Sequence, residues 1–113
     1  MPINDWSESI QVAELQNDPA FADDMAVLAT GYQRVADDLK AGRAGTKARH
    51  LVLDMRHVQF LNSSNIAQLL RVRKLAQLAG AQVRVCSVSD RIFDFSEDVT
   101  TALAAMQMSR SAG

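Results

Sequence analysis

Three short apolar runs alternate with two longer stretches of helical periodicity, and this order limits the possible folds more than any other feature of the sequence. The short runs are Ile10–Leu15, His50–Met55 and Gln82–Val88, and each is rich in residues that favour β-strands. Between them, apolar residues recur at steps of three and four, which places them on one face of a helix. These residues are Phe21, Met25, Leu28, Tyr32, Val35 and Leu39 in the first stretch, and Ile66, Leu69, Val72, Ala76 and Ala79 in the second. The alternation predicts an α/β fold: a mixed, mostly parallel β-sheet with helices packed on it.

The ends of these elements carry boundary signals. Asp18 and Pro19 predict the start of the first helix, because aspartate is a good cap and proline fits the first helical position. Gly80 predicts the end of the second helix. Ala41–Arg49 has the glycines and charges of an exposed loop. Because this loop lacks the lysine and hydroxyl spacing of a P-loop, it indicates phosphate binding only weakly.

The C-terminal part of the chain predicts one more strand and one more helix. Arg91–Phe95 reads as a strand, and Ser96 is suited to cap the helix that follows. Only Ser89 and Asp90 separate this strand from the preceding one, whereas parallel neighbours need a connection of about a dozen residues. The two strands therefore form a hairpin, or a connecting segment is absent. The inner face of the last helix comprises Val99, Leu103 and Met106.

The composition fits one globular domain spanning residues 1–113. Apolar residues make up 48% of the chain and charged residues 22%, which is typical of a folded protein. The formal net charge is −1, so a broad basic surface that binds nucleic acid is not expected. Arg71, Arg73 and Lys74 form a small basic cluster, which we interpret as the solvated face of the second helix.

Candidates for covalent, metal or membrane chemistry are few. Cys86 is the single cysteine, so no intrachain disulfide is expected, and its apolar strand favours an inert thiol. No apolar run approaches the roughly 20 residues that span a bilayer, and the N-terminus lacks signal-peptide features. His50 and His57 lack the paired spacing of metal ligands, and no catalytic set of nucleophile, base and orienting group is apparent. We therefore expect a cytoplasmic protein that is not an enzyme, needs no cofactor or metal, and does not bind membranes.

A polar segment, Asn62–Asn65, interrupts the apolar pattern between the second strand and the second helix. Asn62 or Ser63 is a good helix cap, and a cap stabilises a helix by about 1 kcal/mol without any further function. A single cap, however, accounts for one polar residue and not for four in succession. A serine hydroxyl at a helix start is also well placed to carry a phosphate, because the helix N-terminus stabilises negative charge.

The sequence around this segment resembles the central part of a STAS domain, the fold of bacterial anti-sigma-factor antagonists. In that family an apolar strand ends in Asp-Leu, and a valine, an aromatic residue and an apolar residue follow. Asp-Ser-Ser-Gly or Asp-Ser-Thr-Gly then precedes a helix, a glycine and a second apolar strand. The matching residues here are Asp54, Val58, Phe60, Leu61, Ser63, Ser64 and Gly80, with the strand through Cys86.

The resemblance implies a protein-binding switch in sigma-factor-dependent transcription. In such proteins the first serine of the pair is phosphorylated by an anti-sigma-factor serine kinase of the histidine-kinase-like ATPase class. The unmodified antagonist binds that kinase, phosphorylation breaks the complex, and a metal-dependent serine phosphatase reverses the modification. Carried over by position, Ser63 is the expected phosphoacceptor and Ser64 its neighbour or substitute. The expected partner-binding residues are Asn62, Ser63, Ser64, Asn65 and Gln68.

The sequence departs from the family pattern at three places. Asn62 stands where the family usually has aspartate, and Asn65 stands where it has glycine, so a side chain at position 65 is expected to restrict a closely docking partner. At Ser89 and Asp90 the family carries a further helix, which this chain lacks. Two other functions stay open: a STAS scaffold or transporter subunit that is not phosphorylated, and a nucleotide-binding sensor that uses the glycine-containing loop at Ala41–Arg49.

Overall fold

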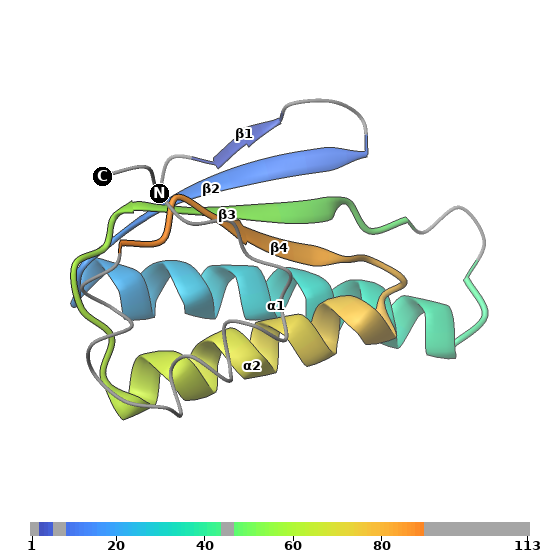
Figure 1. The fold of residues 1–113 in the computed structure, drawn as a ribbon. Coiled ribbons are helices and arrows are strands. Elements are labelled where there is room, and N and C mark those ends of the chain that lie inside the picture. Colours follow the sequence, from blue (N-terminus) through green and yellow to red (C-terminus); the bar gives the residue numbers. More distant parts are fainter. Residues whose placement is uncertain (1–2, 6–8, 44–46, 90–113) are drawn as a thin grey trace.

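The structure, a computed structural model, describes residues 3–5, 9–43 and 47–89. These residues form four strands and two long helices (Figure 1). Strands and helices alternate after the first hairpin, as the sequence pattern predicts. The elements are β1 (Ile3–Asp5), β2 (Ile10–Gln16), α1 (Ala20–Lys40), β3 (His50–His57), α2 (Ser63–Leu78) and β4 (Val83–Cys86).

The four strands form one sheet in the order β1-β2-β3-β4 (Figure 1). β2, β3 and β4 are parallel, which confirms the predicted mostly parallel sheet, and β1 adds to the edge of β2 in the antiparallel direction. The sequence did not predict β1, because three residues are too few to show a period. The register aligns the carboxyl ends of the three parallel strands, so that Glu14 pairs with Asp54 and Asp54 with Cys86.

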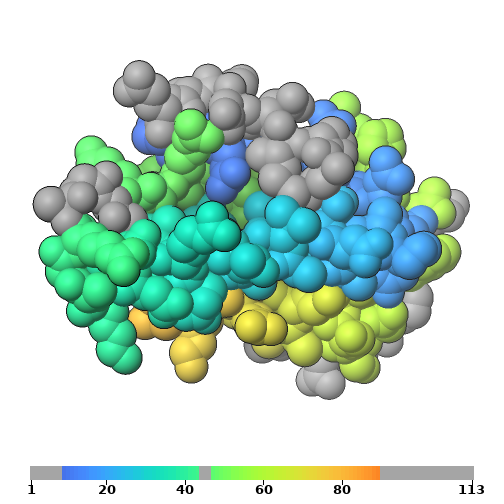
Figure 2. Space-filling view, turned by 180° about the vertical axis from the view of Figure 1, so that it is seen from behind, coloured from blue at the N-terminus to red at the C-terminus, as the bar shows by residue number. Residues whose placement is uncertain are grey.

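Both helices cover the same face of the sheet and lie side by side (Figures 1 and 2). The strands turn alternate residues toward this layer, and Leu51, Leu53 and Met55 of β3 are almost completely buried beneath it. Each large apolar side chain buried in this way stabilises the fold by about 1.5–3 kcal/mol. The predicted helix faces are the ones that pack on the sheet. Buried helix residues are Phe21, Met25, Leu28, Ala29 and Tyr32 of α1, and Asn65, Leu69, Val72, Leu75 and Ala76 of α2.

The helix boundaries agree with the sequence signals, with one correction. α1 begins at Ala20, so Pro19 occupies the capping position and not the first helical position. Asp18 precedes it and accepts a hydrogen bond from the backbone N–H of Ala22 at 3.1 Å. At the end of α2, Gly80 has a φ of 81°, a left-handed conformation that glycine adopts without strain.

The third parallel strand is shorter than predicted. β4 ends at Cys86, and Ser87 follows with a φ of 57°, which turns the chain out of the strand before the buried Val88. The further strand predicted at Arg91–Phe95 and the helix predicted after Ser96 lie outside the described residues. The same holds for the junction from Ser89 to Asp90, of which only Ser89 is described.

Candidate functional site

Two loops meet at the carboxyl edge of the parallel sheet, where α/β proteins commonly place their functional groups. One loop follows β2 and contains Asn17 and Asp18, and the other joins β3 to α2 and contains Gln59 and Asn62. The backbone N–H of Gln59 donates to the side-chain oxygen of Asn17 at 2.8 Å. Segments that lie far apart in the sequence are therefore joined directly beside the polar segment.

The N-terminus of α2 is closed by a capping box made of two asparagines. Asn62 is the cap residue, and its side-chain oxygen accepts from the backbone N–H of Asn65 at 2.8 Å. In return, the side-chain oxygen of Asn65 accepts from the backbone N–H of Asn62 at 3.2 Å. Such reciprocal bonds satisfy two backbone donors at once. The prediction of a cap at Asn62 or Ser63 is confirmed, and the structure assigns it to Asn62.

Asp18 holds both asparagines from the neighbouring loop. Its carboxylate accepts from the side-chain nitrogen of Asn62 at 3.0 Å, and from that of Asn65 at 3.1 and 3.0 Å. We call Asp18, Asn62 and Asn65 the Asp18 clasp. Hydrogen bonds to an ionised group are stronger than neutral ones, and a negative charge is favourable near a helix N-terminus. The clasp therefore fixes the start of α2 against the loop that precedes α1.

The clasp corrects one sequence-based expectation and adds a residue. Asn65 is only 3% exposed and points into the clasp, so its side chain does not face a docking partner. Asp18, which the sequence suggested only as a helix cap, lies in the site and supplies a carboxylate near position 62, where this chain lacks the aspartate of the family pattern. The place of Asp18 in this site follows from the pairing of β2 with β3, which brings the loop after β2 beside the loop that leads to Asn62.

Ser63 and Ser64 occupy the first turn of α2, and both side chains are exposed. Neither hydroxyl makes a hydrogen bond within the described part of the chain. Since Asn62 performs the capping, the serines are not needed to complete the helix end. Their hydroxyl groups are therefore accessible at the positive end of the α2 dipole.

The surface around the serines is apolar and, further along α2, basic. Phe60 precedes them with 55% of its surface exposed, and Leu70 follows with 41% exposed. Gln68 is half-buried, and its side-chain oxygen accepts from the Asn65 amide at 3.4 Å. α2 also carries the predicted basic cluster at positions 71, 73 and 74, but no acidic residue. Large exposed apolar side chains beside polar ones are typical of protein-binding surfaces.

Asp54, Cys86 and His50 also stand out in the sequence, and the structure gives the surroundings of each. Asp54 accepts from the backbone N–H of Arg56 at 3.0 Å, which agrees with a turn-stabilising role. Burial, and next the charge of Asp54, raises the pKa of the Cys86 thiol, so this group stays protonated and unreactive at neutral pH. His50 accepts from the backbone N–H of Gln82 at 3.0 Å, and the described residues contain no cluster suited to a metal ion.

The structure thus defines a small α/β domain with two helices on one face of a mostly parallel sheet and a capped helix N-terminus at its carboxyl edge. Comparison with family models identifies the family: the STAS domain matches residues 9–102, and the chain belongs to this family. No curated protein matches the sequence. No helix within the described ranges has the length and apolar character needed to cross a membrane.

The solved structures that share the fold include the following two. One is an anti-sigma-factor antagonist (STAS) domain protein from Planctomyces limnophilus, with a TM-score of 0.66 and 16% identity over 99% of this chain and 90% of that one. The other comes from the stressosome, a signal integration and transduction hub, with a TM-score of 0.59 and 14% identity over 98% of this chain and 89% of that one. At these identities the likeness extends to the fold alone.

Proposed function

We propose that this STAS domain is a phosphorylation-switched protein-binding module of the anti-sigma-factor-antagonist type, and not an enzyme. In its unmodified state it binds an anti-sigma-factor serine kinase in the bacterial cytoplasm and thereby regulates sigma-factor-dependent transcription. Ser63 is the proposed phosphoacceptor and Ser64 its neighbour or substitute. Asn62, Ser63, Ser64 and Gln68 belong to the proposed contact surface, while Asn65 supports it from below.

One observation carries the proposal: the capping box at the start of α2 is complete without either serine. A serine at a helix start commonly acts as the cap residue. Here the cap residue is Asn62, whose side-chain oxygen accepts from the backbone N–H of Asn65 at 2.8 Å. Two exposed hydroxyl groups remain at a site where positive helix charge favours an added phosphate. A purely structural role explains Asn62 and leaves Ser63 and Ser64 without one.

The proposed modification follows simple chemistry. The Ser63 hydroxyl oxygen takes the γ-phosphoryl group of ATP, ADP leaves, and a base on the kinase accepts the hydroxyl proton. The product carries about −1.5 to −2 charges at neutral pH where a neutral hydroxyl stood. A partner that buries Phe60 would also have to bury this charge, so the complex dissociates. A serine phosphatase then adds water, restoring the hydroxyl and releasing inorganic phosphate.

The test is a phosphorylation assay with the anti-sigma-factor kinase from the same genome and ATP. Intact-protein mass spectrometry should show one added phosphate on the wild-type chain and none on the Ser63→Ala variant. Ser64→Ala is the matched control, because it removes an equally exposed hydroxyl one residue away and should leave the modification in place. Phosphate found only on Ser64, or on neither serine, would overturn the assignment of Ser63.

A second candidate function is a constitutive STAS scaffold or subunit of a larger complex, such as a transporter. The Asp18 clasp favours it, because the clasp holds the α2 N-terminus in one conformation without any modification. Co-purification with the products of neighbouring genes separates the two functions. A switch loses its partner in the Ser63→Asp variant and keeps it in Ser63→Ala, whereas a scaffold that does not use the serines keeps its partner in both.

A further inference from the structure

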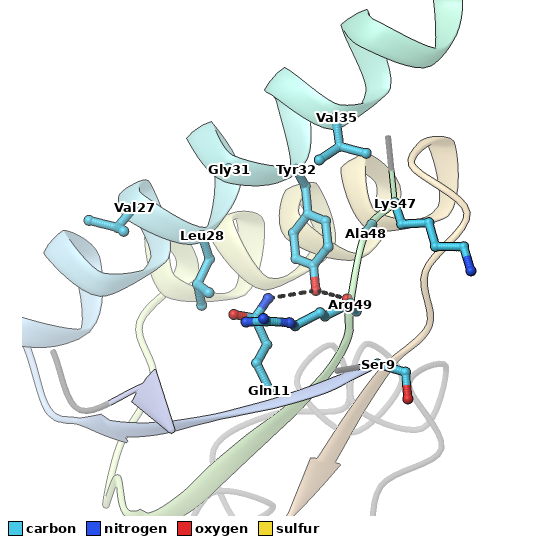
Figure 3. A pocket seen from close by; sticks show the side chains of 10 residues that line it. All are labelled: Ser9, Gln11, Val27, Leu28, Gly31, Tyr32, Val35, Lys47, Ala48 and Arg49. Atoms are coloured by element: carbon cyan, nitrogen blue, oxygen red, sulfur yellow. Dashed lines mark hydrogen bonds between the residues drawn. The ribbon is translucent and has the colours of Figure 1, made fainter. Parts of the chain in front are cut away.

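A cavity of about 710 Å³ lies at the other end of the sheet, between the middle of α1 and the amino ends of β2 and β3 (Figure 3). Its volume is in the range of pockets that hold small organic molecules. Ser9 and Gln11 lie on its β2 side. β2 spans seven residues between this cavity and the loop of Asp18, so roughly 20 Å separate the cavity from the serines.

The α1 wall of the cavity is apolar and contains a gap. Leu28 and Val35 line it, and Val27 stands at its edge with 58% of its surface exposed. Gly31 lies between them, and apart from its chain neighbours and the backbone of α1, no heavy atom lies within 4 Å of the place where its β-carbon would be. A side chain at position 31 would therefore enter open space beside this wall. The missing side chain helps to keep the cavity open.

The polar groups of the cavity floor are already paired. The Tyr32 hydroxyl donates to the backbone carbonyl of Arg49 at 2.7 Å and accepts from the side-chain nitrogen of Gln11 at 3.3 Å (Figure 3). Tyr32 is 3% exposed, and burial raises the pKa of its hydroxyl, so the group stays neutral. Along α1 a ligand therefore meets the apolar side chains of Val27, Leu28 and Val35, while the polar side chains of Gln11 and Arg49 lie on the opposite side of the cavity (Figure 3).

The charged side chains among the described residues of the cavity wall are basic. Lys47 and Arg49 both contribute to the wall that precedes β3, and no acidic residue of the described ranges lines the cavity. Lys47 is exposed and stands at the rim, where its long side chain reaches solvent (Figure 3). A lysine ammonium next to an apolar hollow attracts an anion whose remaining part is apolar.

We propose that this cavity binds a small organic monoanion with an apolar body, of the medium-chain carboxylate class. The apolar body lies along the α1 wall at Gly31, and the anionic group faces Lys47. The site is separate from the serines and does not depend on the proposed switch. A STAS domain built in this way receives a small-molecule signal at one end of its sheet and presents a protein-binding surface at the other.

The experiment uses Tyr32, which is the only tyrosine of the chain, so that its ring signals in an NMR spectrum need no further assignment. Titration with octanoate should shift the ring signals saturably in the wild-type chain. Gly31→Leu should weaken binding at least tenfold, because the new side chain fills the gap. Thr30→Leu, on the same helix but outside this cavity, is the matched control and should bind within twofold of the wild type.

A second variant tests the charge separately from the cavity. Lys47→Glu changes an exposed loop residue, so folding is preserved, and it should weaken octanoate binding at least tenfold. Binding of octanol, the neutral counterpart, should be weaker than that of octanoate in the wild type and should change less than twofold in this variant.

The proposal is overturned if octanoate gives no saturable shift, or if Gly31→Leu binds it as well as the wild type. Equal binding of octanol and octanoate would overturn the anion, and a shift with ATP or GTP but not with octanoate would overturn the ligand class.

Discussion

The two ends of the parallel sheet are built from the same strands and helices, but one end is closed by hydrogen bonds between loops and the other contains a cavity. At the carboxyl end, side-chain bonds from Asp18 and Asn17 close the gap between neighbouring loops and leave the serines on an outward surface. At the amino end, no side chain at position 31 fills the space beside α1, and a cavity of about 710 Å³ remains. Loop and edge side chains, rather than the strand order, therefore decide which end of the sheet is closed by hydrogen bonds and which end is left hollow.

The largest effect is expected from breaking the Asp18 clasp. Asp18→Ala removes the charged acceptor of the buried Asn65 amide and leaves it only the longer bond to Gln68 at 3.4 Å, and a buried donor that loses a charged acceptor is costly. We expect a loss of about 2 kcal/mol in the free energy of unfolding, measured by urea denaturation. Asp23→Ala, which removes an exposed aspartate from the first turn of the same helix, is the control and should change stability by less than about 0.5 kcal/mol. If both variants lose the same amount, the clasp does not hold this end of the sheet together.

The next effect concerns binding rather than stability. Phe60 has 55% of its surface exposed, so Phe60→Ala removes little from the core. Exposed aromatic residues are often the anchors of interfaces, and we expect roughly a tenfold weaker complex with the kinase, or about 1.4 kcal/mol. Leu78→Ala is the control, since Leu78 is also exposed but lies at the far end of α2. Surface plasmon resonance measures both, and equal losses would show that the partner does not dock beside the serines.

At the amino end of the sheet, the Tyr32 hydroxyl links α1 to two neighbouring segments. Tyr32→Phe removes two hydrogen bonds that join α1 to β2 and to the residue before β3, and it should cost about 1 kcal/mol at neutral pH. Burial raises the pKa of Tyr32 above the ordinary tyrosine value of 10.0, so the folded state favours the neutral hydroxyl. This contribution is fully present below pH 10.0 and is lost as the pH rises toward the folded-state pKa. The variant should therefore lose less stability than the wild type between neutral and strongly alkaline pH, and parallel curves would contradict the role of this hydroxyl.

The sequence predicts most of the fold because both helices carry a clear period. The prediction of the buried face of α1 is confirmed as far as Tyr32. It is wrong at Leu39, which is 41% exposed. The reason is length: 21 helical residues extend about 31 Å, whereas the seven residues of β2 extend about 23 Å, so the last turns of α1 have less sheet to cover.

The serine pair is also visible in the sequence, but the group that holds the site together is not. Asp18 bonds Asn62 and Asn65 across 44 and 47 residues, and a contact at such separation depends on the register of β2 against β3. A local pattern contains no information about that register. The inward direction of Asn65 follows from the same contact, which is why a residue expected to face the partner lies beneath the surface instead.

The smallest effect on stability is expected from a single substitution in the Asp18 clasp, Asn62→Asp. Asn62→Asp keeps an oxygen that caps Asn65, but it replaces the nitrogen that donates to Asp18 at 3.0 Å with a second negative oxygen. The favourable interaction of a carboxylate with the α2 N-terminus offsets part of this repulsion, so we expect a loss of only about 0.5 kcal/mol at low salt. The loss should shrink as added salt screens the two charges.

The double variant Asn62→Asp, Asp18→Asn puts the carboxylate on the α2 side of the contact, where the family pattern has it, and the amide on the other. If one carboxylate in this contact is what matters, the double variant should recover the loss of Asn62→Asp and unfold at the same urea concentration as the wild type, within the error of the measurement. The Asn65 amide then keeps an acceptor in the side-chain oxygen of the new asparagine. If the double variant is instead less stable than the Asn62→Asp variant, Asp18 is required at its own position, and the stability of the carboxyl end depends on where the charge lies and not only on its presence.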